Sequence, residues 1–492
     1  FTNEIGATVD ITGAEQNNWY NANETVFGIG SASALKSLGT YTNATNKLNF
    51  KDKTVLLLDD IEVNKVEEGT LDAWKAGTGT LPASWTPIGA KTWFNGTFDG
   101  QMHTISGVYL NTSSQYAGLF GQIDASGVVK NFYITDSLFK STSYDIGSVV
   151  GASYGTVDSV YSNATVIAEK QRSGGIVGHV PWHNTTAYIK NCWFDGQMEL
   201  ESSASQAGGI LGYIAYEWKA AVSITNCLYT GSIEFEKTST DGSGLRIGGI
   251  VGGARDYYTP TITIENCLSA GKITQSSGST ATPAVSAVYG GFDEGRATTL
   301  NLTNVYGTNE CFAEARIYHI AEVVTTNPAQ KITGTGTLLA ESDLYGTWGY
   351  QNTLLDFTEQ KTWVARRNDV PGLAIFVDEP LSVEGVIRPN TMWYNSSETT
   401  LQINDEADMY GFMKLMLDGE TFKNQTVTLK KDLTMNTTDE TSVGKWQAGT
   451  EVPLNKWTSS NTKKYATFAG TFDGGDHIIS GIYCTGEGTR TG

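Results

Sequence analysis

"RSGGIVGHV" occupies residues 172–180, and its glycine-rich centre returns twice further along the chain. GGIVG at 174–178 is followed by GGILG at 208–212 and by GGIVG at 248–252. Three further copies match less closely: AGLFG, GSVVG and AVYGG, which end at Gly121, Gly151 and Gly291. The final glycines of the six copies recur at intervals of 27 to 40 residues. A period of this length without a helical pattern predicts a solenoid in which each repeat forms one coil.

A second short pattern follows each pentapeptide. Its members are KNFYI (130–134), DSVYS (158–162), KNCWF (190–194), TNCLY (225–229), ENCLS (265–269) and TNVYG (303–307). Residues of this kind, separated by Gly and Asn turns, favour short strands. We therefore expect an all-β fold, a right-handed parallel β-helix whose coils pair with the coils above and below.

Stacking in this register predicts what each column of side chains contains. One column would hold Ser159 and five asparagines, Asn131, Asn191, Asn226, Asn266 and Asn304. Stacked asparagine amides can hydrogen-bond to one another along the axis. The next column would face the core and holds Phe132, Val160, Cys192, Cys227, Cys267 and Val305. Because phenylalanine and valine share this column, the three cysteines are predicted to be buried free thiols rather than metal ligands.

The chain also repeats over a much longer distance. FNGTFDGQMHTISGVYL at 94–110 resembles FAGTFDGGDHIISGIYC at 468–484, and His103 lies 374 residues before His477. Both histidines are expected to serve the architecture of the module. We expect a first unit up to residue 376 and the truncated start of a second homologous unit at 377–492. The parent protein would then be a tandem array of such units.

Two segments are good helix candidates, 31–41 and 405–419, and they occupy the same place in each unit. Asp405 is predicted to be the N-cap of the second helix. Because the open end of a β-helix is an adhesive edge, each helix is predicted to belong to a cap. Residues 1–50 would form the N-terminal strand and helix cap. Residues 51–376 would form the β-helix, with its core at 117–310 and a closing segment.

Composition excludes several classes of protein. The net charge of −19 disfavours nucleic acid as a partner and suits a dispersed extracellular protein. Five cysteines, an odd number, make a disulfide framework improbable. No apolar run is long enough for membrane insertion of this fragment. No cofactor or metal is predicted, since the chain lacks HExxH and has five histidines.

Three stretches resemble the GLUG motif of bacterial secreted and cell-surface proteins: GGIVGHV…IKNCWFDGQM, GGILGYI…ITNCLYTGSI and GGIVGGA…IENCLSAGKI. A pattern that accompanies this motif, W.PIG…F.GTFDG..H.ISG.Y, stands at 85–109. The resemblance covers roughly 85–310, with a partial second copy at 468–483. It implies a β-solenoid of an adhesin-like protein, secreted or attached to the cell wall. Such repeats also occur in non-catalytic regions of immunoglobulin A proteases, and the motif itself implies no active site.

Aromatic residues gather in the loops that follow the three central pentapeptides, HVPWHNTTA (179–187), YIAYEWKAA (213–221) and GARDYYTPT (253–261). If the coils stack in register, these residues form one ridge, which suits the face of a sugar or a protein contact. The predicted ligand-binding residues are Trp182, His183, Tyr216, Trp218, Tyr257 and Tyr258. Alternatively, these side chains pack over the edge of the core.

Catalysis has no recognisable motif in this sequence. Glycosidases need two carboxylates at a set separation, and no pair stands out among Asp195, Glu199, Glu201, Glu217, Glu234, Glu236, Asp241 and Asp256. We therefore predict a non-catalytic adhesin or binding stalk for a host glycan or glycoprotein, with immunoglobulin one conceivable target. Neighbouring tandem units of the same chain are expected partners. A carbohydrate-active β-helix enzyme (polysaccharide lyase or glycoside hydrolase) and a pure spacer are the alternatives.

Overall fold

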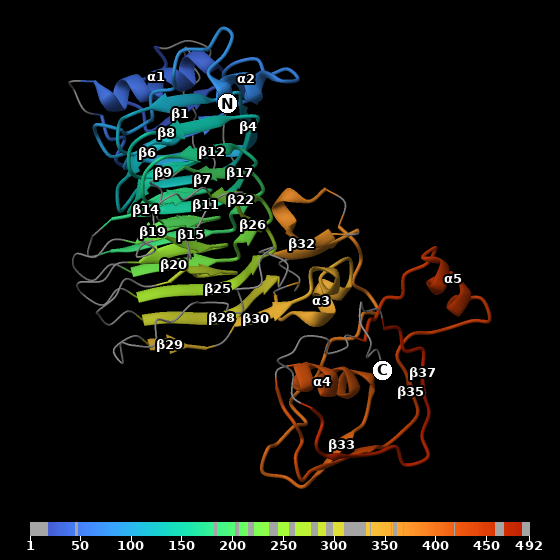
Figure 1. Cartoon of the computed structure of the whole chain (residues 1–492). Coiled ribbons are helices and arrows are strands. Elements are labelled where there is room, and N and C mark those ends of the chain that lie inside the picture. Colours follow the sequence, from blue (N-terminus) through green and yellow to red (C-terminus); the bar gives the residue numbers. More distant parts are fainter. Residues whose placement is uncertain are drawn as a thin grey trace. The chain divides into compact units, whose positions relative to one another are not determined.

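The computed structural model (Figure 1) divides into two compact units, residues 1–338 and 339–492. The residues it describes are 18–44, 48–181, 185–201, 206–214, 221–235, 245–254, 261–276, 284–291, 299–308, 331–334, 336–355, 357, 362–367, 369–378, 380–417, 419–457 and 467–484. Among them, no helix combines the length and apolarity that crossing a membrane requires.

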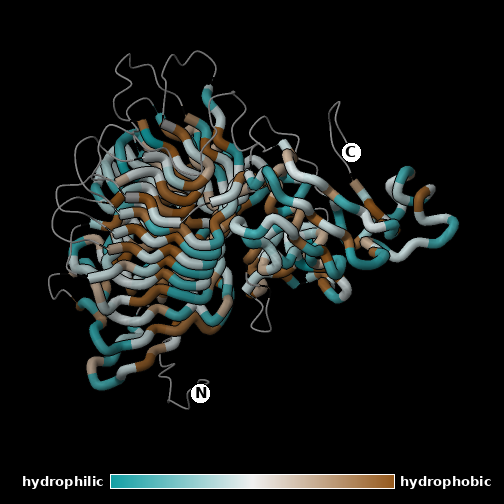
Figure 2. Tube along the Cα trace, turned by 90° about the horizontal axis from the view of Figure 1, so that it is seen from below, coloured by the Kyte–Doolittle hydropathy of each residue, from teal (hydrophilic) through white to brown (hydrophobic). Residues whose placement is uncertain are grey.

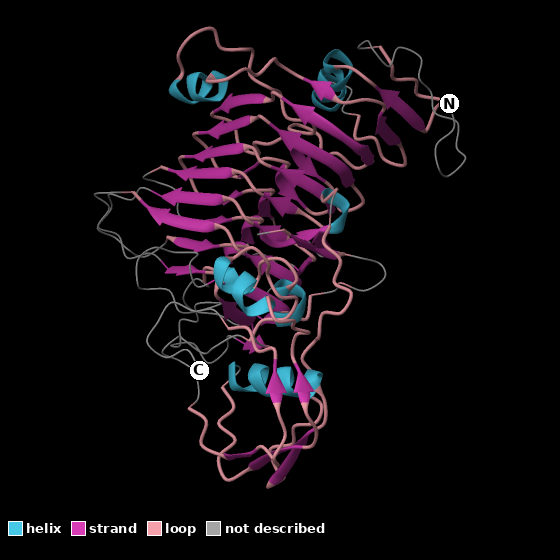
Figure 3. Ribbon diagram, turned by 90° about the vertical axis from the view of Figure 1, so that its right-hand side faces the viewer, coloured by secondary structure: helices cyan, strands magenta, loops and turns pink. Residues whose placement is uncertain are grey.

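The first unit consists of successive coils that each add strands to several parallel sheets (Figures 1 and 3). The long sheet contains β4 (Thr97–Ser106), β7 (Val128–Thr135), β11 (Thr156–Ser162), β15 (Thr186–Lys190), β16 (Trp193–Phe194), β20 (Ala221–Thr225), β21 (Leu228–Tyr229), β25 (Thr261–Ser269) and β28 (Thr299–Thr308). The short strands β29 (Lys331–Thr333) and β30 (Gly336–Leu339) pair with β28. The second sheet contains β5 (Tyr109–Thr112), β8 (Leu138–Ser141), β12 (Thr165–Ala168), β17 (Gln197–Leu200), β22 (Ser232–Phe235) and β26 (Lys272–Gln275).

Each pentapeptide joins two further parallel sheets. The third sheet contains β9 (Ile146–Gly147), β13 (Ser173–Gly174), β18 (Gln206–Gly208), β23 (Arg246–Gly248) and β27 (Ala284–Ser286). The fourth contains β6 (Phe120–Ile123), β10 (Val150–Ser153), β14 (Val177–Val180), β19 (Leu211–Ile214) and β24 (Val251–Ala254). Equivalent residues of the pentapeptides pair directly, as Val177 does with Leu211 and Leu211 with Val251. The all-β prediction is confirmed.

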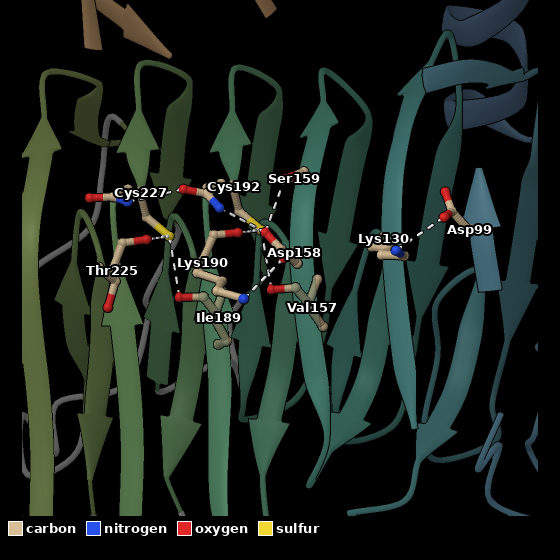
Figure 4. Close-up of polar contacts among 12 residues, drawn as sticks. Asp99, Lys130, Val157, Asp158, Ser159, Ile189, Lys190, Cys192, Thr225 and Cys227 are labelled. Carbon is tan, nitrogen blue, oxygen red and sulfur yellow. Dashed lines mark hydrogen bonds and ion pairs between the residues drawn. The ribbon is translucent and has the colours of Figure 1, made fainter. Parts of the chain in front are cut away.

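The core is a set of apolar columns that run from coil to coil, so hydrophobic segments recur at equivalent places along the tube in Figure 2. Cys192, Cys227 and Cys267 are fully buried free thiols, in line with Phe132 and Val160 of earlier coils. The Cys227 Sγ–H donates to the carbonyl of Thr225 at 3.4 Å (Figure 4). Burial raises the pKa of the Cys227 thiol well above its usual value. The predicted inward column of thiols is confirmed.

The asparagine column is also present, and it has a backbone cause that the sequence analysis missed. Every residue of this column has a positive φ, between 50° and 59°: Asn131, Ser159, Asn191, Asn226, Asn266 and Asn304. Asparagine tolerates this left-handed conformation better than most residues. Nδ2 of Asn226 donates to Oδ1 of Asn191 at 3.0 Å, and Nδ2 of Asn304 donates to Oδ1 of Asn266 at 2.9 Å. The column therefore bends each strand and links the coils.

The pentapeptide glycines have no room for a side chain. A Cβ on Gly175 would lie 2.1 Å from the carbonyl oxygen of Gly209 and 2.4 Å from Cγ of Phe194. A Cβ on Gly178 would lie 2.7 Å from the carbonyl oxygen of Gly151. Backbone thus packs against backbone where the third and fourth sheets meet, which only glycine permits.

The N-terminal cap contains β1 (Val26–Ile29), α1 (Ala32–Asn43), β2 (Thr54–Leu57), β3 (Ile61–Glu62) and α2 (Thr70–Ala76). β1 and β2 extend the long sheet, and α1 lies at its N-terminal end (Figure 1), as predicted for 31–41. The Ser31 hydroxyl caps α1 by accepting from the Ala34 N–H. α2 was not predicted. It places Trp74 against Tyr109, Leu138 and Ile167 of the second sheet.

The second unit repeats this cap. It contains β33 (Thr400–Ile403), α4 (Glu406–Leu417), β34 (Thr426–Leu429), β35 (Leu433–Thr434), α5 (Ser442–Ala448), β36 (Thr471–Asp473) and β37 (Ile479–Ser480). Trp393 Nε1 donates to the Asp408 carbonyl at 3.1 Å, as Trp19 does to the Ala34 carbonyl at 3.1 Å. Asp405 Oδ1 accepts from the Asp408 N–H at 2.8 Å, which confirms the predicted N-cap.

Residues 339–376 belong to the compact second unit although they precede its repeat. They contain η1 (Glu341–Asp343), α3 (Trp348–Asn352), β31 (Trp363–Arg366), β32 (Asp369–Leu373) and η2 (Ala374–Phe376). Trp348 Nε1 donates to the Pro453 carbonyl at 3.2 Å. The boundary predicted at 376/377 marks the start of the sequence repeat, whereas the compact unit begins at 339.

The repeated histidines occupy equivalent places. His103 Nδ1 lies 3.3 Å from Asp60 Oδ1, which also accepts from the Thr104 N–H. His477 Nδ1 lies 3.1 Å from Asp432 Oδ1, which accepts from the Ile478 N–H. Each pair ties a turn to a strand, which agrees with the architectural role expected for both histidines.

Gly175→Ala is expected to lower the free energy of unfolding by about 1–3 kcal/mol, because the added methyl overlaps backbone atoms that cannot move independently. Gly444→Ala is the matched control, since Gly444 lies in α5 with no heavy atom within 4 Å of a new Cβ. Urea unfolding of both variants measures the difference. Equal stabilities for the two variants would contradict the backbone packing described above.

Candidate functional site

The six predicted ligand-binding residues lie outside the described residues: Trp182, His183, Tyr216, Trp218, Tyr257 and Tyr258. The structure does place the points where their loops begin. Val180 pairs with Ile214, and Ile214 pairs with Ala254, at the ends of β14, β19 and β24. The three loops therefore leave one edge of the fourth sheet, one coil after another.

Aromatic side chains of the preceding coils gather at this same edge. Phe94 bridges to Ile123, Ile123 pairs with Ser153, and Tyr154 follows β10 directly. The Trp93 ring stacks on the Tyr154 ring with centroids 4.3 Å apart and planes 11° apart. Tyr116 adds a third ring 6.5 Å from Trp93.

We call Trp93, Tyr116 and Tyr154 the aromatic corner, and all three rings are partly exposed. Burial raises the pKa of Tyr154 to about 12, with Tyr116 and Asp124 adding to the shift. The Tyr154 hydroxyl is therefore neutral at physiological pH. Partly exposed rings can pack on the apolar face of a sugar, and the tyrosine hydroxyls at their edges can hydrogen-bond to its hydroxyls.

A buried ion network supports the aromatic corner: Asp145, Arg172 and His179. Asp145 Oδ1 lies 2.9 Å from Arg172 Nε and 3.1 Å from His179 Nδ1. Gln115 Nε2 donates to the other carboxylate oxygen at 2.5 Å. Tyr116, Asp145 and Arg172 have positive φ values of 65°, 67° and 71°. Left-handed backbone is costly for such residues and clusters at functional sites, so this corner merits a functional test.

The charges of this network follow from burial. Burial alone would raise the pKa of Asp145, but the contacts with His179 and Arg172 outweigh it, and the pKa is lowered. Burial lowers the pKa of His179, against the opposing effect of Asp145. At neutral pH, Asp145 is ionised beside Arg172, and His179 is neutral, with its Nδ1 3.1 Å from Asp145 Oδ1 and 3.4 Å from an Arg172 guanidinium nitrogen. The Arg172 guanidinium lies 5.1 Å from the centroid of the Tyr144 ring, which it helps to hold.

A second aromatic row lies on the long sheet. The ring centroids of Tyr133 and Tyr161 are 5.8 Å apart, and those of Tyr161 and Trp193 are 5.3 Å apart. Asp195 accepts from the Tyr161 hydroxyl at 3.3 Å, and Trp193 Nε1 donates to Thr230 Oγ1 at 2.7 Å. Because Trp193 is only 4% exposed, this row packs against its neighbours more than it offers a binding face.

Two of the candidate carboxylates, Glu199 and Glu201, meet in a groove of about 460 Å³ beneath α2. Glu199 pairs with Lys75 of α2, and Glu201 lies 3.4 Å from Lys140. Of the others, Asp195 and Glu234 accept hydrogen bonds from hydroxyls. Glu217, Glu236, Asp241 and Asp256 lie outside the described residues. Within the described ranges, no three His, Cys, Asp or Glu residues are grouped to hold a metal.

Comparisons with known proteins give partial similarities. No protein-family model matches the chain. Halomucin of Haloquadratum walsbyi is 32% identical over 125 residues, which cover 25% of this chain and 1% of that protein. A protein of Evansella cellulosilytica named "Putative Gly-rich membrane protein" is 34% identical over 80 residues, 15% of this chain and 9% of that protein. The chain thus spans less than a tenth of either relative.

One solved structure, a "putative immunoglobulin A1 protease" of Bacteroides ovatus, is 17% identical with a TM-score of 0.46. The match covers 73% of this chain and 94% of that chain. None of these similarities establishes a family or an activity for this chain.

Acidification is expected to weaken the ion network. The pKa of free histidine is about 6.5, and that of folded His179 is lower, so the unfolded state binds more protons between the two values. The stability contributed by neutral His179 is therefore full above about pH 6.5 and is lost as pH falls below it. Urea unfolding at two pH values, one on each side of this point, measures the loss.

His179→Gln is expected to reduce this loss of stability, because glutamine does not titrate. His103→Gln is the matched control, since His103 is partly exposed in a surface pair with Asp60. The same pH dependence in His179→Gln as in the unmodified chain would show that His179 does not stay neutral in the folded state.

Proposed function

We propose that this chain is a non-catalytic module of a secreted or cell-surface protein, and that it binds a glycan or glycoprotein at the aromatic corner. The stacked pair of Trp93 and Tyr154, at the edge from which three aromatic-rich loops leave, carries this proposal. The predicted residues of those loops would enlarge the same face. These loops, which differ in sequence from coil to coil, would then contact the host glycan or glycoprotein. Immunoglobulin is one conceivable glycoprotein of this kind.

The charges favour a neutral sugar over an acidic one. Arg172, a cation close to Tyr116 of the aromatic corner, is already paired with buried Asp145. The chain as a whole carries a net charge of −19, which would repel an anionic polysaccharide. Ring stacking and neutral hydroxyls are then the main attractions, and they suit an uncharged glycan.

The architecture proposed with this function is a right-handed parallel β-helix of the GLUG-repeat type, adhesin-like and arranged in tandem. The parallel pairing of successive coils supports it, because parallel crossover connections are right-handed in nearly all proteins. The repeat of the cap, down to its tryptophan hydrogen bonds, supports a tandem arrangement. Neighbouring units of the same chain would be its permanent partners.

A glycan and host-protein array probed with the full chain tests the binding function. Trp93→Ala combined with Tyr154→Ala is expected to weaken binding to any hit at least tenfold, because both halves of the stack are lost. Tyr133→Ala is the matched control, since Tyr133 is a partly exposed ring of the second aromatic row on the long sheet. Binding that survives the double change, or that Tyr133→Ala weakens equally, rejects the aromatic corner.

The groove beneath α2 supports one alternative, a carbohydrate-active enzyme, because Glu199 and Glu201 lie there beside two lysines. Each glycan hit is therefore also incubated with the chain and analysed for cleaved product. Product that disappears in Glu199→Gln or Glu201→Gln would replace the binding proposal with this one. The absence of both ligand and product would leave the spacer function.

A further inference from the structure

A lysine and an aspartate are buried together in the second unit. Lys456 Nζ lies 2.5 Å from Asp343 Oδ1, and the two side chains are 1% and 12% exposed. Asp343 ends η1 in the segment that precedes the second repeat, whereas Lys456 follows α5 within that repeat. The pair therefore connects two segments that are 113 residues apart in the sequence.

The surroundings of this pair are aromatic and closely packed. Lys456 Nζ lies 4.6 Å from the centroid of the Trp348 ring. The Lys456 backbone N–H donates to Gln351 Oε1 at 2.8 Å, and Asn352 Nδ2 donates to the Asp343 carbonyl at 2.8 Å. These contacts fix both backbones, so the two side chains are held against each other with little freedom.

Burial distinguishes this pair from other pairs of a lysine with a carboxylate in the described chain. Lys75 and Glu199, which are also in close contact, are 40% and 21% exposed. Lys190 and Asp158 are 45% and 19% exposed. An ion pair withdrawn from water usually contributes little net stability, because desolvation offsets the attraction. Net stability alone therefore does not explain why Lys456 is buried against a carboxylate.

We propose that Lys456 and Asp343 become joined by an intramolecular isopeptide bond. A proton passes within the pair from the ammonium to the carboxylate, which leaves an amine and a carboxylic acid in contact. Nζ then attacks Cγ of Asp343, the new C–N bond forms, and the bond from Cγ to the hydroxyl oxygen breaks. The hydroxyl departs with one proton from Nζ as water. Nothing is oxidised or reduced, and no co-reactant is needed.

The fold contributes two things to this reaction: it holds Lys456 Nζ in contact with the Asp343 carboxyl group, and it excludes water from the pair. Groups held in contact react as if at very high concentration, on the order of 10⁵ M or more in well-oriented cases. A site closed to solvent also disfavours the return of water, which would hydrolyse the amide. The exposed pair of Lys75 and Glu199 has the contact without the burial, and it is expected to remain ionic.

The bond would close a covalent ring from residue 343 to residue 456, which contains β33, α4, β34 and α5. A pulling force along the chain would then pass through the cross-link and leave the enclosed elements folded. Such a cross-link would do what disulfides do in other proteins, and all the described cysteines of this chain are free thiols. The inference is independent of the proposed glycan binding.

Intact-mass spectrometry of the purified full chain tests this inference. The cross-linked chain is expected to weigh about 18 Da less than its sequence, the mass of one water. Proteolysis is expected to give one branched peptide that contains both residues. Lys456→Arg keeps the charge but cannot form the amide, so it is expected to show its full sequence mass. Lys75→Arg is the matched control and is expected to keep the deficit.

Asp343→Asn provides a second readout that does not depend on the folding of Lys456→Arg. Asparagine would release ammonia instead of water, so the deficit would be about 17 Da and the branched peptide would be identical. Full sequence mass in the unmodified chain, with no branched peptide, would show that the pair is only ionic and would overturn the proposal.

Discussion

Parallel pairing between coils is the constraint on which the first unit depends. Each strand directs its N–H and C=O groups along the axis, and only the strand of the next coil can satisfy them. Because β7, β11, β15, β20, β25 and β28 pair in sequence, a shift in one coil would unpair its neighbours. Register is therefore fixed over the whole stack, and the same kind of side chain recurs at each level.

Columns of like residues follow from this register, and their chemistry differs by face. Inward columns are apolar or carry thiols, as at Cys192 and Cys227. One outward column of the long sheet alternates in charge, with Lys130 paired to Asp99 and Lys190 paired to Asp158 at 3.1 Å each (Figure 4). This face of the long sheet is thus occupied by contacts between coils. The aromatic corner lies at the ends of strands, outside these columns.

Much of the fold could be predicted from the sequence, because the pentapeptides recur in it with the period of one coil. The pentapeptides and the asparagine column predicted the register, and Asp405 predicted the start of α4. The left-handed backbone of the asparagines was missed, since periodicity reports position and not φ. α2 was missed because it is short and because its N-cap residue, Gly69, has no side chain that could signal a helix start.

The candidate site was harder to predict for a physical reason. Trp93 and Tyr154 meet across coils, and the pentapeptide before Tyr154, GSVVG, is among the degenerate ones. Lys456 and Asp343 lie in different repeats and share no local pattern. Contacts of this kind arise from three-dimensional packing, which a repeat period does not encode.

A cross-link between neighbouring coils tests the register most directly. Ser223 pairs with Thr263, so the double variant Ser223→Cys, Thr263→Cys places two outward thiols on adjacent strands about 4.8 Å apart. Their separation suits a disulfide, which mild oxidation is expected to form in high yield. Ser223→Cys with Thr261→Cys is shifted by two residues and is expected to stay reduced. Efficient cross-linking of the shifted pair, with none in the paired one, would contradict the stacked register.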